Sequence, residues 1–234
     1  MRLSPLILLV ALPLSADALG DLKAALLRLK SSDPIAATAE VQTWSKGSGK
    51  EAKPKQGKTS TRIEQGPQGL RLGWTGEQVA QALEARRKKT GDASDPLSAP
   101  EAWRILNAAE DLLLELEKAK VKAETVEPWH DQPARKLVLG LDLDLDAESK
   151  EHLKQADRTA TIWLAADGTP YAEVIQMDMK GRVLLISFEI HETTRREFRH
   201  IGNRLVVVRE EKEQRASGMG QGGESRTVLT VTLP

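Results

Sequence analysis

A short acidic repeat is the first pattern in the sequence that could perform chemistry. Asp142, Asp144 and Asp146 stand at alternate positions, the spacing with which a calcium-binding loop begins. The rest of that loop is missing, because Ala147 stands where glycine is required and Leu153 stands where a bidentate glutamate is required. The repeat therefore favours a strand with an acidic outer face over a calcium site.

Histidine is the second candidate, because four of these residues could supply zinc ligands. His191 and His200 fall on one predicted strand, about 30 Å apart and on opposite faces, so they cannot share a metal ion. His152 falls on a predicted short helix and has no partner at helical spacing. We expect solvent-facing or capping roles for these three and for His130, and we predict no metal and no cofactor.

The third kind of chemistry, nucleophilic catalysis, lacks candidate residues. The sequence contains no cysteine and no Gly-x-Ser-x-Gly elbow. The glycine-rich segment GMGQGG lies between two predicted strands and opens no helix, so it does not fit a phosphate-binding loop. Because no nucleophile and base can be placed together, we predict no catalytic residues and a protein that is not an enzyme.

Residues 160–190 alternate apolar and polar side chains around two turn signals, and they predict a three-stranded antiparallel sheet. Asp167-Gly168 is typical of a two-residue turn, since both turn positions need positive φ and glycine adopts it without steric cost. Such a turn pairs Ala166 with Thr169. The pairs that follow are Leu164–Tyr171, Ile162–Glu173 and Ala160–Ile175.

Lys180-Gly181 is a weaker signal of the same kind and predicts the second turn. It pairs Met179 with Arg182. The pairs that follow are Met177–Leu184, Ile175–Ile186, Glu173–Phe188 and Tyr171–Ile190. The two turns together gather apolar side chains on one face of the three strands, in agreement with the period of two. This face contains Ile162, Leu164, Tyr171, Ile175, Met177, Leu184, Ile186, Phe188 and Ile190.

Glu173 falls on that apolar face, where an unpaired carboxylate costs on the order of several kcal/mol. Three explanations stay open. The carboxylate pairs with a basic side chain such as Arg182 or Arg196, or the face is unsealed and holds water or a ligand, or a one-residue bulge turns Glu173 outward. If the carboxylate has no protein partner, the face is a binding surface and not merely a core.

The remaining segments predict the elements that surround this sheet. Helical periodicity predicts amphipathic helices over residues 21–30, 75–89 and 99–118, and a short helix over 147–155. Thr75 with Gln78 and Ser98 with Glu101 form the capping boxes of the second and third helices. Strands are predicted over residues 36–45, 59–65, 69–74, 121–126, 136–145, 190–200, 205–214 and 227–233. About nine or ten strands, nearly all antiparallel, with grouped helices indicate an α+β fold.

The N-terminal residues predict export. A single basic residue, an apolar run over residues 6–12 and the pattern Ala16-Asp17-Ala18 are typical of a secretory signal peptide cleaved after Ala18. The apolar run is shorter than the roughly 20 residues of a membrane span. We therefore predict a periplasmic or secreted protein with one domain over residues 19–234, in which residues 46–58 and 217–225 form flexible loops.

The composition argues against two classes of binding partner, nucleic acids and anionic membrane surfaces. The sequence has 34 basic and 34 acidic residues, so its formal net charge is zero. Balanced charge gives no basic patch for nucleic acid or for an anionic membrane surface. Without cysteine, the exported chain has neither disulfides nor an acylated N-terminal cysteine. We expect a monomer that does not span a membrane.

Several of these segments resemble the outer-membrane lipoprotein carrier (LolA/LolB-like) half-barrel superfamily. The matching features are the helix DLKAALLRL ahead of a strand, the hairpin TRIEQGPQGLRLGW, helices inserted as a lid, and above all TIWLAADGTPYAEV. The resemblance covers most of residues 20–234. It implies a curved antiparallel sheet whose concave face is covered by helices, with an apolar cavity for acyl chains between them. Sparse aromatic residues and a long helical insertion depart from the family pattern.

This resemblance implies a non-enzymatic carrier of a lipid or an acylated protein. The ligand would lie between the sheet of residues 160–190 and the helix of residues 99–118. The residues expected to line the site are Ile162, Leu164, Tyr171, Glu173, Ile175, Met177, Ile186, Phe188 and Ile190 from the sheet and Leu106 and Leu113 from the helix. One alternative is a periplasmic protein-interaction or sensor module that uses the same half-barrel, and another is a hydrolase.

Overall fold

The computed structural model of the protein describes residues 17–48, 52–88, 97–143, 151–183, 186–218 and 222–234. The predicted signal peptide lies outside these ranges apart from its last two residues. Asp17 caps the first helix, because its carboxylate accepts a hydrogen bond from the backbone N–H of Gly20 at 2.8 Å. Ala18 is the first residue of that helix. Cleavage after Ala18 stays a prediction.

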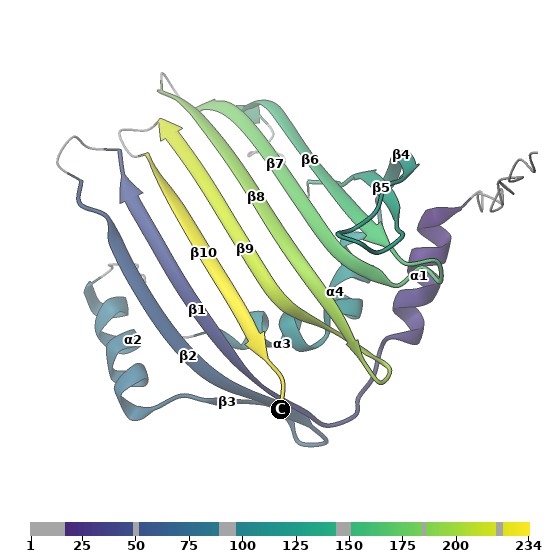
Figure 1. The fold of residues 1–234 in the computed structure, drawn as a ribbon. Helices are drawn as coiled ribbons and strands as arrows, with labels where there is room; N and C mark the ends of the chain where they lie inside the picture. The colour runs from purple at the N-terminus through teal and green to yellow at the C-terminus, as the bar shows by residue number, and fades with distance from the viewer. Residues whose placement is uncertain (1–16, 49–51, 89–96, 144–150, 184–185, 219–221) are drawn as a thin grey trace, which may run out of the picture.

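The described residues form one antiparallel sheet of ten strands that does not close into a barrel (Figure 1). Its strand order is β3-β2-β1-β10-β9-β8-β7-β6-β5-β4, so the first strand pairs with the last and the two edge strands are consecutive in the chain. The strands are β1 (Ile35–Gly47), β2 (Lys55–Gly66), β3 (Gly69–Gly73), β4 (Lys120–Val126), β5 (Arg135–Gly140), β6 (Leu153–Leu164), β7 (Pro170–Val183), β8 (Ile186–Ile201), β9 (Arg204–Gly218) and β10 (Gly223–Thr232).

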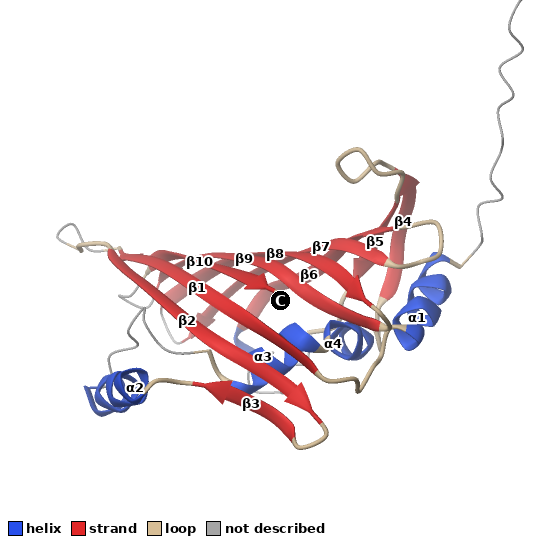
Figure 2. Ribbon diagram, turned by 60° about the horizontal axis from the view of Figure 1, so that its bottom comes forward, coloured by secondary structure: helices blue, strands red, loops and turns tan. Residues whose placement is uncertain are grey.

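The helices lie on the concave side of this sheet, and the third and fourth of them cover its apolar core. They are α1 (Ala18–Arg28), α2 (Gly76–Lys88), α3 (Ala99–Leu106) and α4 (Ala108–Glu115). The last three lie in the connection between the edge strands β3 and β4, so this connection passes from one edge of the sheet to the other. Figure 2 shows the sheet bending around α3 and α4. The predicted α+β half-barrel with helices on its concave face is confirmed.

Both predicted capping boxes are present. The Ser98 hydroxyl accepts a hydrogen bond from the backbone N–H of Glu101, and the Glu101 carboxylate accepts one from the backbone N–H of Ser98. Thr75 and Gln78 make the same reciprocal contacts, at 3.2 and 2.8 Å. Local sequence thus determines where α2 and α3 begin.

The helix predicted over residues 99–118 is broken in two at Asn107. The backbone of Asn107 leaves helical geometry, with φ −125° and ψ 48°. Its amide nitrogen donates to the backbone oxygen of Trp103 and to Gln65, and its amide oxygen accepts a hydrogen bond from Arg204 at 2.8 Å. Asparagine readily exchanges helical hydrogen bonds for such contacts. Tertiary partners therefore divide a continuous apolar stripe between two short helices.

The first predicted turn is one residue longer than expected. The backbone N–H of Ala165 donates to Thr169, and that of Gly168 donates to Ala165, so three residues form the loop. Gly168 has the positive φ expected of it, 84°. A β-bulge at Leu164 absorbs the extra residue, so Leu164 pairs with Pro170 and the predicted Leu164–Tyr171 pair is wrong. Beyond the bulge, the predicted pairs Ile162–Glu173 and Ala160–Ile175 are confirmed.

The second predicted turn, at Lys180-Gly181, is wrong. Strand β7 continues to Val183, which pairs with Ile186, so the chain reverses four residues later. Gly181 serves a different purpose, because a Cβ atom at this position would lie 2.5 Å from the ring of Phe188. The glycine provides space for that ring within the sheet. The predicted pairs Met179–Arg182, Met177–Leu184, Ile175–Ile186, Glu173–Phe188 and Tyr171–Ile190 are therefore replaced by others.

Other boundaries of strands and helices also differ from the predictions. Strands extend into both predicted loops: β1 reaches Gly47 and β2 begins at Lys55, while β9 reaches Gly218 and β10 begins at Gly223. Strand β5 ends at Gly140, earlier than predicted. The end of the short helix predicted over residues 147–155 is wrong, because β6 begins at Leu153. Residues 147–150 lie outside the described ranges.

Candidate functional site

The concave face of the sheet and the helix pair α3–α4 enclose the apolar core. Ile162 and Leu164 of β6 and Leu137 and Leu139 of β5 are fully buried on the sheet side. The helices bury a matching set of side chains: Ala102, Ile105, Leu106, Ala109, Leu112 and Leu116. Figure 1 shows this pair lying against one half of the strands' length, near the β8–β9 turn. These side chains pack together as one apolar core.

Glu173 lies inside this layer and has a cationic partner. The side chain is 1% exposed, and its Oε2 atom accepts a hydrogen bond from Nη1 of Arg196 at 3.2 Å. Arg196 stands directly opposite Glu173 on strand β8. The first of the three explanations for Glu173, a partner such as Arg196, is therefore confirmed. The other carboxyl oxygen, Oε1, is buried and has no hydrogen-bond partner among the described residues.

Arg196 also connects the sheet to the helix pair. Its Nη1 atom contacts Glu115 at 3.1 Å and Asp111 at 3.3 Å, and both acids belong to α4. Its Nε atom donates to Glu210 of β9 at 3.0 Å. One buried guanidinium thus has four carboxylate neighbours, which belong to three elements: α4, β7 and β9.

Two further arginines complete what we call the ionic cluster. Arg104 of α3 pairs with Glu210 through both terminal nitrogens, and Arg158 of β6 donates to Glu115 at 2.7 Å. The ionic cluster comprises Arg104, Asp111, Glu115, Arg158, Glu173, Arg196 and Glu210. Six elements contribute to the ionic cluster: α3, α4, β6, β7, β8 and β9.

Burial and charge perturb the acids of the ionic cluster in opposite directions. Burial raises the pKa of Glu173 to about 8, against the charge of Arg196, and the nearby carboxylates of Glu115 and Asp111 add to the effect. Burial likewise raises the pKa of Asp111. For Glu210, burial acts to raise the pKa, but the hydrogen bond and charge of Arg104 outweigh it and lower the pKa overall. Burial thus favours the protonated form of Glu173, although Arg196 lies beside it.

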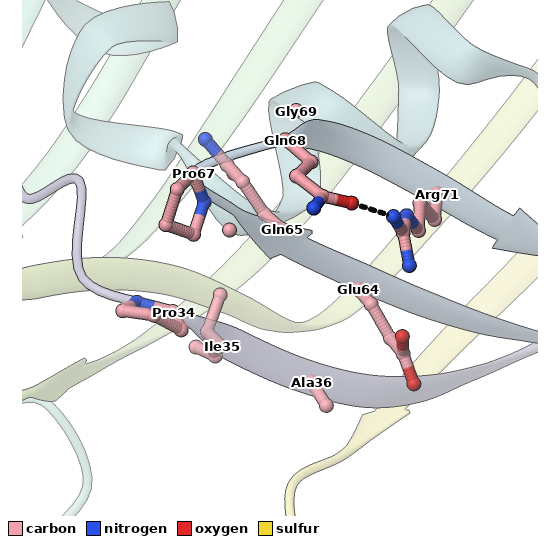
Figure 3. A pocket seen from close by; sticks show the side chains of 10 residues that line it. Pro34, Ile35, Ala36, Glu64, Gln65, Pro67, Gln68, Gly69 and Arg71 are labelled. Atoms are coloured by element: carbon pink, nitrogen blue, oxygen red, sulfur yellow. Dashed lines mark hydrogen bonds between the residues drawn. The ribbon is translucent and has the colours of Figure 1, made fainter.

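A polar cavity of about 330 Å³ adjoins the ionic cluster on the concave face. Arg104, Arg158 and Arg196 line it, together with Lys212 of β9. The rest of the lining consists of Glu101, Ile175, Met177, Glu192, Thr194 and Glu210. A second, more apolar cavity of about 500 Å³ lies at the β2–β3 hairpin, away from the cluster (Figure 3). Pro34, Ile35 and Pro67 line that cavity, and Arg71 donates to Gln68 beside it.

The predicted ligand-binding residues divide between the two ends of the strands. Ile162, Leu164, Glu173, Ile175 and Leu106 are buried under or within the helix pair. Leu113 packs on the core, Tyr171 is half-buried, and Met177 lines the polar cavity. Ile186, Phe188 and Ile190 share the concave face but lie toward the β7–β8 turn, at the other end of the strands, where Ile186 is 49% exposed.

Sequence reasoning missed most of the ionic cluster. It named Glu173 and Arg196 but not the residues that α3, α4, β6 and β9 contribute. A weak signal exists in the helices, where Arg104, Asp111 and Glu115 are spaced by seven and four residues and so share one helical face. That face borders the apolar stripe. The strand partners could be found only from a correct register.

The described residues among the predicted metal-ligand candidates lie on the surface. His130, His152, His191 and His200 are all exposed, as expected. Within the described ranges, no group of three or more histidine, aspartate or glutamate side chains could hold a metal ion. Asp142 is exposed and lies 3.8 Å from Lys118, while Asp144 and Asp146 fall outside the described residues.

Among the helices that the structure describes, none is long and apolar enough to cross a membrane. No protein-family model matches the chain, and no curated protein matches it. Among solved structures, the chain is similar to one described as "Crystal structure of LolA superfamily protein NE2245 from Nitrosomonas europaea". The sequence identity is 12%, 93% of each chain is covered, and the TM-score is 0.31.

Proposed function

We propose that the protein is an exported, non-enzymatic carrier that binds the acyl chains of a lipid or of an acylated protein between the sheet and the helix pair α3–α4. The single observation that carries this proposal is the placement of that pair. Two short helices, separated at Asn107, cover the apolar part of an open concave face. They belong to the connection between the edge strands. Lifting them would expose an apolar surface without breaking any pairing between strands.

The free energy of burying an acyl chain is similar to that of exposing the helix side chains, which supports reversible binding. Burial of an acyl chain contributes about 0.8 kcal/mol per CH₂, or roughly 12 kcal/mol for a chain of about sixteen carbons. Lifting the helices exposes large side chains at about 1.5–3 kcal/mol each, and the four largest buried ones, Ile105, Leu106, Leu112 and Leu116, sum to roughly 6–12 kcal/mol. The two quantities are similar. A ligand that replaces the helix contacts can therefore be both taken up and released, as a carrier requires.

Lipid extraction from the purified protein tests the proposal. The protein would be expressed with its own N-terminus, recovered from the exported fraction, and analysed by mass spectrometry for bound lipid. We expect an acyl-chain lipid to co-purify at close to one molecule per protein. A protein that carries no lipid, and that does not bind a fluorescent fatty acid after delipidation, would show that the proposal is wrong.

A matched pair of substitutions on α4 locates the ligand. Leu112 is fully buried toward the sheet, whereas Leu114 is 68% exposed on the same helix. Leu112→Asn places an amide against the bound chain and should weaken fatty-acid binding, by roughly tenfold if one polar group is left unpaired. Leu114→Asn should leave binding unchanged. Equal affinities in two folded variants would place the ligand elsewhere on the molecule.

A further inference from the structure

The polar cavity beside α3 has a chemistry that acyl-chain binding does not explain. Its volume, about 330 Å³, is at the lower end of the roughly 300–1,000 Å³ of ligand pockets. Ile175 and Met177 are the apolar members of its lining. The other lining residues are charged, apart from Thr194. Such a lining suits a small polar group and does not suit a hydrocarbon chain.

The bases of this cavity retain hydrogen-bond donors. Among the contacts of the described residues, Arg158 uses one nitrogen, Nη2, on Glu115. Arg104 uses its two terminal nitrogens on Glu210, and Arg196 uses Nε and Nη1. Lys212 contacts Glu192 at 2.9 Å. Each guanidinium has five N–H donors and an ammonium has three, so the four bases have more donors than these contacts use.

The acids of the cavity, in contrast, are already engaged. Glu210 accepts hydrogen bonds from Arg104 and Arg196, and Glu192 is paired with Lys212. The carboxylate of Glu101 is held at the start of α3 by Ser98. Both oxygens of Glu210 and one oxygen each of Glu101 and Glu192 are held, so the unused donors of the four bases favour a group that brings acceptors.

The charge balance around the cavity permits an anion. Its lining contains four bases, Arg104, Arg158, Arg196 and Lys212, and three acids, Glu101, Glu192 and Glu210. An incoming anion thus meets a lining that has one more base than acids and has unused donors, and phosphate oxygens are well matched to guanidinium groups.

We propose that this cavity binds a phosphate group, through Arg158, Arg196 and Lys212, and that the phosphate is the headgroup of the carried amphiphile. The second part rests on the proposed carrier function. The acyl chain would then run from the cavity past Ile175 toward the space that α3 and α4 cover.

Calorimetry of the full exported protein with three probes tests this inference. The probes are dodecyl phosphate, dodecyl maltoside and inorganic phosphate, the detergents being kept below their critical micelle concentrations at pH 6.5. Dodecyl phosphate should bind about ten- to a hundredfold more tightly than dodecyl maltoside, as expected for hydrogen bonds to charged groups. Arg158→Gln and Lys212→Gln should each remove about tenfold or more of that preference.

Arg195→Gln is the matched control, because Arg195 adjoins Arg196 in sequence, points to the opposite face and pairs with Glu213. It should leave all three affinities unchanged. Equal binding of the two detergents, or equal losses in the R158Q and R195Q variants, would overturn the phosphate site and leave the carrier proposal standing. Binding of inorganic phosphate with no gain from the dodecyl chain would support the site and overturn the carrier. No binding of any probe would overturn both.

Discussion

Replacement of Glu173 by glutamine should remove most of the pH dependence of stability between pH 4.5 and 8. The pKa of this carboxyl group is raised from about 4.5 to about 8 by burial. The folded protein therefore binds a proton that the unfolded chain releases over this interval. The stability that this proton contributes is fully present below pH 4.5 and is lost as the pH rises to 8.

The size of the effect follows from the shift. One pKa unit corresponds to 1.36 kcal/mol, so the shift of Glu173 corresponds to a loss of about 5 kcal/mol across the interval. The side chain is 1% exposed, so solvent screens it little. Because domains are typically stable by only about 5–15 kcal/mol, a change of this order is readily measured.

Urea unfolding followed by circular dichroism at pH 5, 6, 7 and 8 measures the effect. Glu173→Gln mimics the protonated acid and can still accept the hydrogen bond from Arg196. Its free energy of unfolding should equal that of the wild type near pH 5 and exceed it by several kcal/mol at pH 8. Asp111 and the surface groups titrate in both proteins, so the difference between the two curves isolates Glu173. Parallel curves from pH 5 to 8, or a variant less stable than the wild type at pH 8, would refute the reasoning.

Three other perturbations give distinct outcomes. Arg196→Met leaves buried carboxylates without their shared cation and should lower the free energy of unfolding by about 3–5 kcal/mol in urea titrations, whereas Arg195→Met on the exposed face should change it by less than about 0.5 kcal/mol. Gly181→Ala forces a Cβ atom against the Phe188 ring and should destabilise by about 1–3 kcal/mol in the same assay, whereas Gly76→Ala, where nothing lies within 4 Å, should not. Mass spectrometry of the exported protein should find Leu19 at its N-terminus, and a retained Ala18 would contradict the predicted cleavage site.

The face of each residue in the opening sheet was predictable even where its partner was not. The predicted second turn lies four residues before the observed reversal at Val183 and Ile186. A shift of four residues is even, so each side chain stays on its predicted face although its neighbour changes. Glu173 consequently faces the core as predicted, but its neighbour on β8 is Arg196 and not Phe188. Alternation determines faces, whereas register also depends on the turn.

The errors share a physical cause, which is dependence on contacts distant in sequence. Lys180-Gly181 has the composition of a turn, but the glycine is needed for close approach of the Phe188 ring. The apolar stripe of residues 99–118 continues through Asn107, and the break there depends on Arg204, 97 residues away. The capping boxes at Thr75 and Ser98 need only residues three positions away, and both were predicted correctly.

The ionic cluster and the apolar layer contribute differently to the packing of α3 and α4 on the sheet. Removing Glu173, Arg196 and their partners from water costs free energy that their mutual attraction offsets only in part, so the cluster adds little net attraction. It restricts where α4 can lie, because Asp111 and Glu115 must both reach one guanidinium. The attraction comes mainly from the leucine layer. When the helices lift, water can solvate the charged groups again, while an acyl chain can replace the leucine contacts. Solvation of the charged groups and replacement of the leucine contacts both lower the free energy needed to lift the helices. A reversible carrier needs a cover with this property.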